Sequence, residues 1–320
     1  MKKKILVTGG FGLLGVSLVK YLIKKNFIVV ILDYKNFRKN FFPKTKNIII
    51  ERGNFCQKKF VERIFKKYRF SGVFHLGAQT QVLKALNNPY ETLMINVLGT
   101  INFLEVIRKI KYKIPFIYSS SDKAYGELKK NFYLEDDKLN AVFPYDASKS
   151  SSDLICQSYS KTYQINVGII RSANIFGPND LNIKRIVPET IISVLSNQKL
   201  IIRSSGKQKR DYIFVEDVTR AYFKLYKNLL NKKGDLKVYN IGSKYNLDTL
   251  QMIRKIFKLM KVIPYFEIKN FSKSEINNQR LNYNKITKEL NWKPIHNLNE
   301  SLIKTIDWYK KNYKKLIKNI

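Results

Sequence analysis

Cysteine and histidine are scarce in this chain of 320 residues, which contains two of each. The four residues, Cys56, Cys156, His75 and His296, match no metal-binding or redox spacing. This scarcity disfavours a zinc site and a disulfide framework, so we predict no metal and a reduced, cytoplasmic setting. We expect His75 to pack within a strand and His296 to lie in a loop.

Long apolar runs are also missing. No stretch of the sequence reaches the about 18 apolar residues needed to span a bilayer. The first residues, MKKKILVTGGFGLLGVSLVKYLI, are basic and then apolar as in a signal peptide. However, glycines and Lys20 interrupt the run and no small-residue cleavage site follows. We therefore expect a soluble protein with no membrane partner.

Acidic residues are few, with 24 Asp and Glu against 60 Lys and Arg, which gives a formal net charge of +36. Such a charge suggests nucleic-acid binding. However, the lysines are scattered through every segment, and no zinc-finger, RNA-recognition or helix-turn-helix signature accompanies them. We predict that nucleic acid is not a partner, and steeply salt-dependent DNA retention would be the sign of the opposite.

Strand and helix patterns alternate from the first residues onward. Short apolar runs predict strands at 4–7, 27–32, 48–50, 73–76, 114–118 and 167–170. Amphipathic segments predict helices at 13–24, 55–67, 96–110 and 145–162. This alternation predicts an α/β protein with a Rossmann-type, doubly wound parallel sheet covered on both faces.

The pattern becomes looser after Arg171. Loop-rich stretches at 177–185, 203–210 and 268–282 are mixed with expected helices at 188–196 and 216–230. Segments of this kind often bind ligands on a rigid scaffold. We expect residues 1–171 to form the Rossmann domain, with a return segment at 211–240. Residues 172–320 are expected to form mainly a smaller, interleaved substrate-binding region.

A glycine-rich turn joins the first strand to the first helix in ILVTGGFGLLG. Gly9 permits the tight turn, Gly12 lets the backbone approach a pyrophosphate, and Gly15 allows close helix–sheet packing. Asp33 ends the second strand, where a carboxylate accepts hydrogen bonds from a ribose 2′-hydroxyl and repels a 2′-phosphate. The sequence therefore favours NAD over NADP, although Arg38 leaves some room for NADP.

The segment PYDASKS places Tyr145 and Lys149 one helical turn apart on the same face. A hydride-transfer enzyme that oxidises an alcohol needs a base for the hydroxyl proton. Tyrosine meets this need near neutral pH if its pKa falls by about 3 units, worth about 4 kcal/mol, and a neighbouring ammonium and the positive nicotinamide ring act in that direction. The same spacing occurs at Tyr21, Tyr125 and Tyr265, but only Tyr145 opens a helix after a serine-bearing strand end.

Several motifs together resemble one family across nearly the whole chain. They are VTGGFGLLG, VFHLGAQ, NPYETLMINVLGT, SSSDKAYG, PYDASKS, RSANIFGPND, RDYIFVEDV, YNIGS and LNWKP with LIKTIDWY. The sequence resembles the extended short-chain dehydrogenase/reductases, in particular the nucleotide-sugar epimerase/dehydratase family. Asp122-Lys123, PYDASKSSSDLICQSY and GPNDLNIKRIVP are most similar to the CDP-glucose 4,6-dehydratase type.

The resemblance implies roles for further residues. It implies NAD contacts from Gly9, Phe11, Gly12, Leu13, Gly15, Asp33, Tyr34, Asn54, Phe55, Leu76, Gly77, Ala78, Asn96, Tyr145 and Lys149. For a nucleotide diphosphate-sugar it implies contacts from Gln79, Asn174, Arg185, Arg203 and Arg210, with Thr80 and Gln81 near the sugar. Asn54 departs from the family, where an Asp commonly meets the adenine. A homodimer through the helices at 96–110 and 145–162 is also implied, and we expect Trp292 and Trp308 in the core.

The octet SSSDKAYG carries the features that separate dehydration from epimerisation. By resemblance, Ser121 hydrogen-bonds the sugar 4-hydroxyl, and Asp122 and Lys123 form an acid/base pair where simple epimerases have small neutral residues. The predicted reaction is oxidation at C4, loss of water across C5 and C6, and reduction at C6. Alternatives are a 4-epimerase, a non-catalytic NAD-binding regulatory protein, and an Asp122 that only caps a turn.

Overall fold

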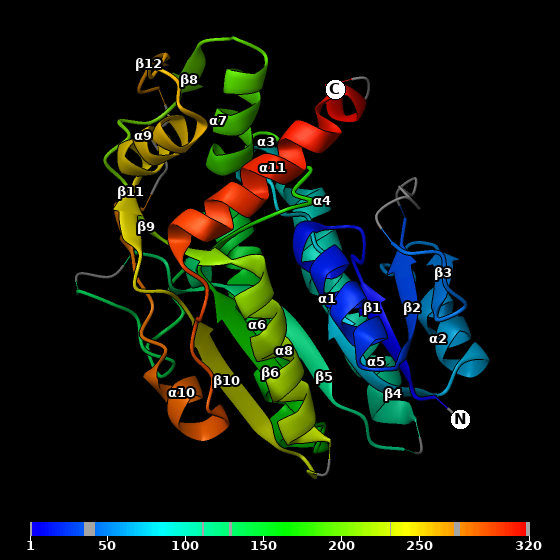
Figure 1. Ribbon diagram of the computed structural model, residues 1–320. Coiled ribbons are helices and arrows are strands. Elements are labelled where there is room, and N and C mark those ends of the chain that lie inside the picture. The colour runs from blue at the N-terminus through cyan, green and yellow to red at the C-terminus, as the bar shows by residue number, and fades with distance from the viewer. Residues whose placement is uncertain are drawn as a thin grey trace.

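A parallel sheet of seven strands forms the centre of the protein (Figure 1). The computed structural model describes residues 2–34, 42–110, 112–127, 130–230, 232–271 and 276–317, and Arg38 lies outside them. The strand order is β10-β6-β5-β4-β1-β2-β3, and all neighbours are parallel. The strands are β1 (Lys4–Thr8), β2 (Ile28–Asp33), β3 (Ile48–Arg52), β4 (Phe70–His75), β5 (Phe116–Ser121), β6 (Val167–Ser172) and β10 (Leu236–Ile241). The predicted Rossmann-type α/β fold is confirmed.

Alternating apolar side chains on the strands bury both faces of this sheet. In β1, Ile5 and Val7 belong to one core cluster and Leu6 to the other, because successive side chains point to opposite faces. Helices α1 (Leu13–Lys24) and α8 (Val215–Leu229) cover the first face. Three helices cover the second face: α2 (Lys58–Lys67), α5 (Gly99–Lys109) and α6 (Pro144–Tyr163).

The chain leaves the sheet after β6 and returns to it once. Helix α8 packs on the first face, and β10 then pairs with β6 along its whole length. The strand before α8, β9 (Lys209–Phe214), does not join this sheet. It belongs to a four-stranded sheet with β7 (Asn174–Phe176), β11 (Asn246–Asp248) and β13 (Asn278–Gln279).

The second sheet and its helices form a smaller part, at the top of Figure 1. A further strand pair joins β8 (Leu200–Ile202) to β12 (Phe266–Ile268). The helices of this part are α7 (Ile186–Leu195), α9 (Thr249–Met260) and α11 (Leu298–Ile317). The short helix α10 (Asn284–Leu290) lies at the lower left of Figure 1 instead, where it packs on β10 and α8. Helix α11 crosses between the two parts in Figure 1 and packs on α7 and α9.

Several predicted boundaries were wrong by a few residues. Helix α2 begins at Lys58 rather than at residue 55, because the Asn54 side chain accepts a hydrogen bond from the Cys56 amide and forms a turn first. The predicted helix at 96–110 is preceded by α3 (Val82–Asn87) and α4 (Pro89–Leu93) and starts as a π-helical turn, Met94–Leu98. The three serines of the octet complete β5 rather than following it.

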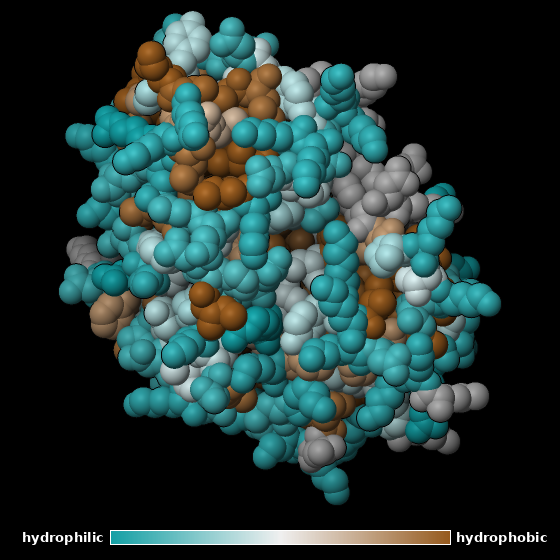
Figure 2. Space-filling model, in the orientation of Figure 1, coloured by the Kyte–Doolittle hydropathy of each residue, from teal (hydrophilic) through white to brown (hydrophobic). Residues whose placement is uncertain are grey.

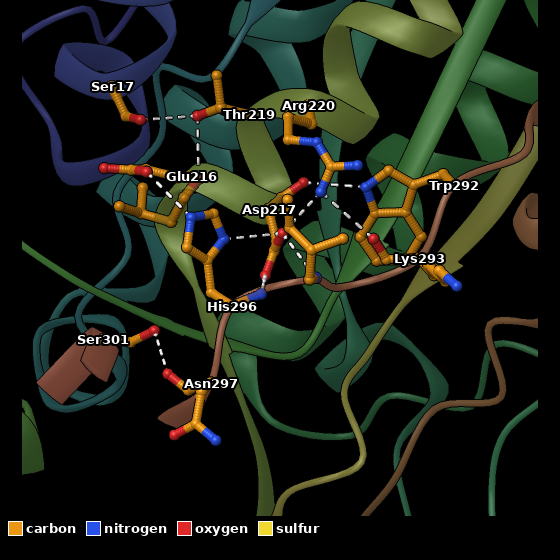
Figure 3. Close-up of polar contacts among 12 residues, drawn as sticks. Ser17, Glu216, Asp217, Thr219, Arg220, Trp292, Lys293, His296, Asn297 and Ser301 are labelled. Carbon is orange, nitrogen blue, oxygen red and sulfur yellow. Dashed lines mark hydrogen bonds and ion pairs between the residues drawn. The ribbon is translucent and has the colours of Figure 1, made fainter. Parts of the chain in front are cut away.

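Hydrogen bonds and ion pairs join residues 292–296 to the first turn of α8 (Figure 3). Asp217 is buried and accepts hydrogen bonds from the amides of Ile295 and His296. The His296 ring lies between Glu216 and Asp217, 3.2 Å and 3.0 Å from their carboxylates. Trp292 is fully buried and donates to the Asp217 carbonyl, while Trp308 packs half-buried on the same core. The expected positions of Trp292 in the core and of His296 in a loop are confirmed, whereas Trp308 lies at the edge of the core.

Hydrophilic side chains cover most of the visible face in Figure 2, with a hydrophobic area over the smaller part near α7 and α9. Among the described residues, none of the helices has the length and apolar character that crossing a bilayer requires. The same residues contain no group of three or more His, Cys, Asp or Glu side chains that could hold a metal ion.

Candidate active site

A cavity of about 780 Å³ lies at the carboxyl ends of the strands, between the large sheet and the smaller part. This is the edge at which open parallel sheets bind ligands, next to the point where the strand order reverses between β1 and β4. The predicted site residues that line it are Gly9, Phe11, Gly12, Leu13, Gly15, Asp33, Tyr34, Phe55, Leu76, Gly77, Ala78, Gln79, Ser121, Asp122, Lys123, Tyr145, Lys149, Asn174, Arg185 and Arg203. Thr80 and Gln81 line it as well.

The glycine turn after β1 is built for close backbone approach. Gly9 has a φ of +65°, and a Cβ there would lie 2.8 Å from the Gly77 amide nitrogen at the end of β4. A Cβ at Gly15 would lie 2.2 Å from the Gly9 carbonyl oxygen. Gly12 precedes the first residue of α1, whose N-terminus has no side-chain cap. The uncapped amides at this cavity wall fit the pyrophosphate of a dinucleotide.

Three residues predicted to contact the cofactor differ in whether they line the cavity. Asp33 ends β2, lines the cavity, and accepts a hydrogen bond of 2.9 Å from the Tyr34 amide. Asn54 does not line the cavity, because its side chain binds the Cys56 amide. Asn96 also lies behind the cavity wall, where its amide group binds both backbone groups of Gln79. The structure therefore places Asp33, but not Asn54 or Asn96, at the wall of the cavity.

Tyr145 and Lys149 project from the first turns of α6, which begins at Pro144, a residue suited to a helix start. Both side chains are buried and line the cavity. The Lys149 ammonium donates a hydrogen bond of 2.7 Å to the Ser119 carbonyl and lies 5.3 Å from the centre of the Tyr118 ring. Burial lowers the pKa of Lys149 to about 8.

In the chain without its cofactor, the pKa of Tyr145 is raised above its usual value. Burial raises this pKa, the charges of Asp146 and Asp122 add to the rise, and Arg185 and Ser121 oppose it. Lys149 alone does not offset this rise, and its ammonium donates to the Ser119 carbonyl. The predicted lowering, which also depends on the positive nicotinamide ring, stays a prediction. A phenolate at Tyr145 therefore needs a further positive charge in the cavity.

The octet places a hydroxyl and a carboxyl at the end of β5. The Ser121 hydroxyl donates to Asp122 Oδ1 at 3.0 Å and accepts a hydrogen bond from the Lys123 amide. Ser121, rather than Asp122, therefore caps the short 3₁₀ helix η3 (Asp122–Tyr125) that follows. Asp122 is 3% exposed, and burial raises its pKa while the Lys123 charge opposes the rise. The carboxyl also interacts with the Lys123 amide, so a part in this turn remains an alternative role for Asp122.

The predicted diphosphate-binding arginines have protein partners. Arg185 lies 3.0 Å from Asp180, and Arg203 contacts Glu189 at 2.8 and 2.6 Å. Both arginines line the cavity. Arg210 does not line it; its side chain is buried and donates to the Lys209 carbonyl.

Comparison with known proteins assigns the family. The sequence profile of the NAD dependent epimerase/dehydratase family matches residues 5–242. The chain belongs to this family. A dTDP-D-glucose 4,6-dehydratase of Dictyostelium discoideum is 29% identical over 97% of this chain and 82% of its own length. The dTDP-glucose 4,6-dehydratase of Salmonella typhimurium is 28% identical over 97% of this chain and 93% of its own length.

Solved structures of both activities resemble the fold of this family member. UDP-glucose 4-epimerase of Thermotoga maritima has a TM-score of 0.87 and 28% identity, covering 97% of this chain and 99% of its own. A dTDP-glucose 4,6-dehydratase of Bacillus anthracis in complex with NAD has a TM-score of 0.87 and 25% identity, covering 98% and 99%. The chain is therefore an NAD-dependent enzyme of the epimerase/dehydratase type, and NAD is its cofactor.

Our sequence prediction missed several residues of the cavity wall in this epimerase/dehydratase. They are Leu14, Val82, Leu83, Lys84, Ile95, Ser119, Ser120, Ser172, Ala173, Ile175, Asp180, Leu181, Asn182 and Lys184. The continuation of β6 and the motif GPNDLNIKR carried a usable signal, since both follow a predicted strand end. The helix α3 residues gave none, because only the folded chain brings that helix over the cavity.

Proposed function

We propose that this enzyme is a nucleotide-sugar 4,6-dehydratase, which converts an NDP-hexose, CDP-glucose or a related one, to a 4-keto-6-deoxy sugar. The observation that carries the proposal is the buried Asp122 carboxyl beside Ser121, since burial favours its protonated form. A carboxylic acid that keeps its proton near neutral pH can protonate a leaving hydroxyl. The names of relatives at 28–29% identity support the same reaction.

The first step is removal of the C4 hydroxyl proton. When bound, NAD would accept a hydride from C4, and its reduced form would give a hydride to C6. The oxidised nicotinamide ring would also add a positive charge to the cavity. Tyr145 takes the hydroxyl proton as its phenolate, and Ser121 orients the hydroxyl through a hydrogen bond. Lys149 holds the cofactor ribose from the same helical face as Tyr145. The C4 carbon loses a hydride and becomes a ketone.

The second step is loss of water. The C4 ketone acidifies the C5 proton, which Lys123, or a group that Lys123 organises, removes. Asp122 gives its proton to the C6 hydroxyl, the C6–O bond breaks, and water leaves as a C5–C6 double bond forms. Return of a hydride to C6 and of a proton to C5 completes the 4-keto-6-deoxy sugar, so no external oxidant or reductant is consumed.

In this proposal the two parts of the chain bind the cofactor and the substrate. Residues 1–171 with the return segment 211–240 hold NAD, and residues 172–320 hold mainly the nucleotide sugar. Asn174 and Gln79 contact the sugar, and Arg185 and Arg203 exchange their carboxylate partners for the diphosphate. Arg210 joins them only if its buried side chain turns into the cavity.

We further propose a homodimer that pairs α5 and α6 with the same helices of a second copy. Exposed apolar residues near α6 support it, among them Tyr90 at 73%, Leu93 at 41% and Leu154 at 51%. Sedimentation equilibrium tests this proposal, with Leu154→Lys expected to give a monomer. A wild-type protein that sediments as a monomer would refute it.

Mass spectrometry of purified enzyme with CDP-, dTDP-, UDP- and GDP-glucose tests the proposed reaction. A dehydratase yields a product lighter by one water, whereas an epimerase yields an isomer of unchanged mass. A regulatory protein that does not turn over leaves all four sugars unchanged. In Asp122→Asn we expect water loss to fall by at least about 10²-fold, because a general acid contributes that much. Asp136→Asn, at an exposed carboxyl nearby in sequence, is the matched control and keeps the wild-type rate.

A further inference from the structure

Arg203, one of the two arginines in the cavity wall, is held by a carboxylate in a two-pronged ion pair. Its Nη1 and Nη2 atoms lie 2.8 and 2.6 Å from the two oxygens of Glu189 in α7. Nη2 also donates a hydrogen bond of 3.0 Å to the Lys184 carbonyl. A carboxylate and a phosphate offer a guanidinium the same pair of acceptors. Glu189 therefore binds Arg203 in the way that a phosphate group would.

The position of this ion pair allows its two partners to separate. Arg203 and Lys184 line the cavity, whereas Glu189 lies behind them and does not. The side chains of Arg203 and Glu189 are 28% and 19% exposed. Breaking a pair at this degree of exposure costs less than breaking a fully buried one, because water reaches both charges. Arg203 can therefore leave Glu189 when an anionic ligand enters the cavity.

The proposed reaction gives a reason for weak binding of the diphosphate. Oxidation, loss of water and reduction take place at C4, C5 and C6 of the sugar, so substrate and product carry the same nucleoside diphosphate. Contacts to this group hold the product as firmly as the substrate, and they do not stabilise the transition state selectively. A side chain that weakens these contacts therefore helps product release without raising the barrier to the chemical steps.

We propose that Glu189 determines the affinity for the nucleotide sugar by competing with its diphosphate for Arg203. Without ligand, both terminal nitrogens of Arg203 contact Glu189. On binding, phosphate oxygens replace carboxylate oxygens, so the free energy of the broken ion pair is lost from that of the new contact. The enzyme therefore binds nucleoside diphosphates less tightly than Arg203 without its carboxylate partner would allow. This inference rests on the proposed contact between Arg203 and the diphosphate.

Isothermal titration calorimetry with CDP, dTDP, UDP and GDP tests the competition directly. Glu189→Gln removes the charge and keeps the shape of the side chain. We expect the nucleotide that the wild type binds best to bind this variant about three- to tenfold more tightly, the effect of releasing a partly exposed, two-pronged pair. An unchanged affinity would overturn the proposal. A lower affinity would also overturn it, since Glu189 would then support Arg203 in its contact with the ligand.

Glu267→Gln is the matched control, because it removes the same charge from the same part of the chain. Glu267 lies in β12, which pairs with β8, and its carboxylate is 3.7 Å from Lys199 and 3.5 Å from Lys269. It does not line the cavity. We expect this variant to bind nucleotides as the wild type does. A gain in affinity as large as that of Glu189→Gln would show that net charge controls binding, contrary to the proposal.

A double variant assigns the effect to Arg203. Arg203→Met alone is expected to weaken nucleotide binding by about tenfold, because the diphosphate loses a charged hydrogen-bond donor. Adding Glu189→Gln to Arg203→Met is expected to change nothing further, since no arginine is left there for Glu189 to bind. If Arg203→Met binds as the wild type does, the proposed diphosphate contact fails, and the inference with it. If it binds more weakly but Glu189→Gln does not bind more tightly, only the competition is wrong.

Turnover gives a second measurement. Because the tighter binding in Glu189→Gln is the same for substrate and transition state, we expect its KM to fall by the same factor with no gain in kcat. A KM at or above the wild-type value contradicts the proposal. If Glu189→Gln does not fold, Glu189→Ala removes the same carboxylate and is measured in its place. Calorimetry needs no turnover, so it decides the competition even if the wild type forms no dehydrated product and the proposed reaction fails.

Discussion

Arg171 and Asp153 form a fully buried, two-pronged ion pair. Arg171 Nε and Nη2 each lie 2.9 Å from one oxygen of Asp153, and the two side chains are 2% and 0% exposed. The remaining Nη1 donates to the Tyr125 hydroxyl and to the Glu135 carbonyl. Arg171 lies in β6, Asp153 lies on α6 and Tyr125 is the last residue of η3. The pair therefore fixes the two elements that carry Tyr145 and Asp122 relative to the sheet.

We predict that Asp153→Asn lowers the free energy of unfolding by about 3–5 kcal/mol, because it leaves the Arg171 charge buried without a counter-charge. Urea unfolding followed by circular dichroism measures the change. The double variant Arg171→Met with Asp153→Leu removes both charges and is expected to recover most of the loss. A double variant as unstable as the single one would show that packing, rather than the unpaired charge, is responsible.

Tyr145→Phe removes the proposed base with little change in shape. We expect the rate of product formation to fall by about 10²–10⁴-fold, the usual contribution of a general base. Binding of the nucleotide sugar, measured by calorimetry, is expected to stay close to that of the wild type. Tyr265→Phe is the matched control, since Tyr265 has the same spacing to a lysine but is exposed and outside the cavity. Equal activity in the two variants would exclude Tyr145 as the base.

Gly15→Ala and Gly12→Ala compare two glycines of the same turn. A Cβ at residue 15 would lie 2.2 Å from the Gly9 carbonyl oxygen, whereas at residue 12 the same atom would be 3.3 Å away. We expect Gly15→Ala to cost about 1–3 kcal/mol or more, because backbone must shift. Gly12→Ala is expected to cost less in stability. Thermal unfolding of both variants checks the order, and a reversed order would mean that the turn relaxes easily around residue 15.

The parallel sheet and the phosphate-binding turn were predictable from sequence because they depend on local patterns. Buried strands of four to six apolar residues, and glycines at fixed positions after β1, need no knowledge of distant segments. The carboxyl ends of parallel strands share one edge, so Asp33 and Ser121 could be placed at the same cavity before the fold was known.

Interactions between distant segments were not predictable in this way. The ion pair of Arg203 with Glu189 joins a residue after β8 to α7, and sequence alone gave Arg203 no partner. The pKa of Tyr145 depends on its burial and on the charges of Asp122 and Asp146 around it, which only the folded chain shows. The resemblance gave Asn54 and Arg210 ligand contacts, which stay predictions, but it could not show the hydrogen bonds that their side chains make to the Cys56 amide and the Lys209 carbonyl.

Asp33→Ser tests how the enzyme selects NAD. The carboxylate at the end of β2 lines the cavity and repels a 2′-phosphate, whereas it accepts hydrogen bonds from a ribose 2′-hydroxyl. A hydrogen bond to a charged group is worth about 1.5–3 kcal/mol, so we expect NAD affinity to fall by at least about tenfold and the preference over NADP to shrink further. Fluorescence titration with both cofactors measures this. Unchanged affinity for both would show that Asp33 does not meet the ribose.

His75 makes the stability of the fold depend on pH. The ring is buried between two threonine hydroxyls, with its nitrogens 2.9 Å from Thr8 Oγ1 and 3.2 Å from Thr100 Oγ1, and burial lowers its pKa from 6.5 to about 3. Between these two values the unfolded chain binds a proton that the folded chain does not. The contribution of neutral His75 to stability is therefore present above the unfolded pKa and is lost as the pH falls below it.

In His75→Gln this loss disappears, so we expect the free energy of unfolding to fall less steeply with acid than in the wild type, by up to about 1.4 kcal/mol per pH unit. Urea unfolding at about pH 7 and about pH 5 measures the two slopes, and parallel slopes would mean that the folded chain accepts a proton on His75 as readily as the unfolded chain does.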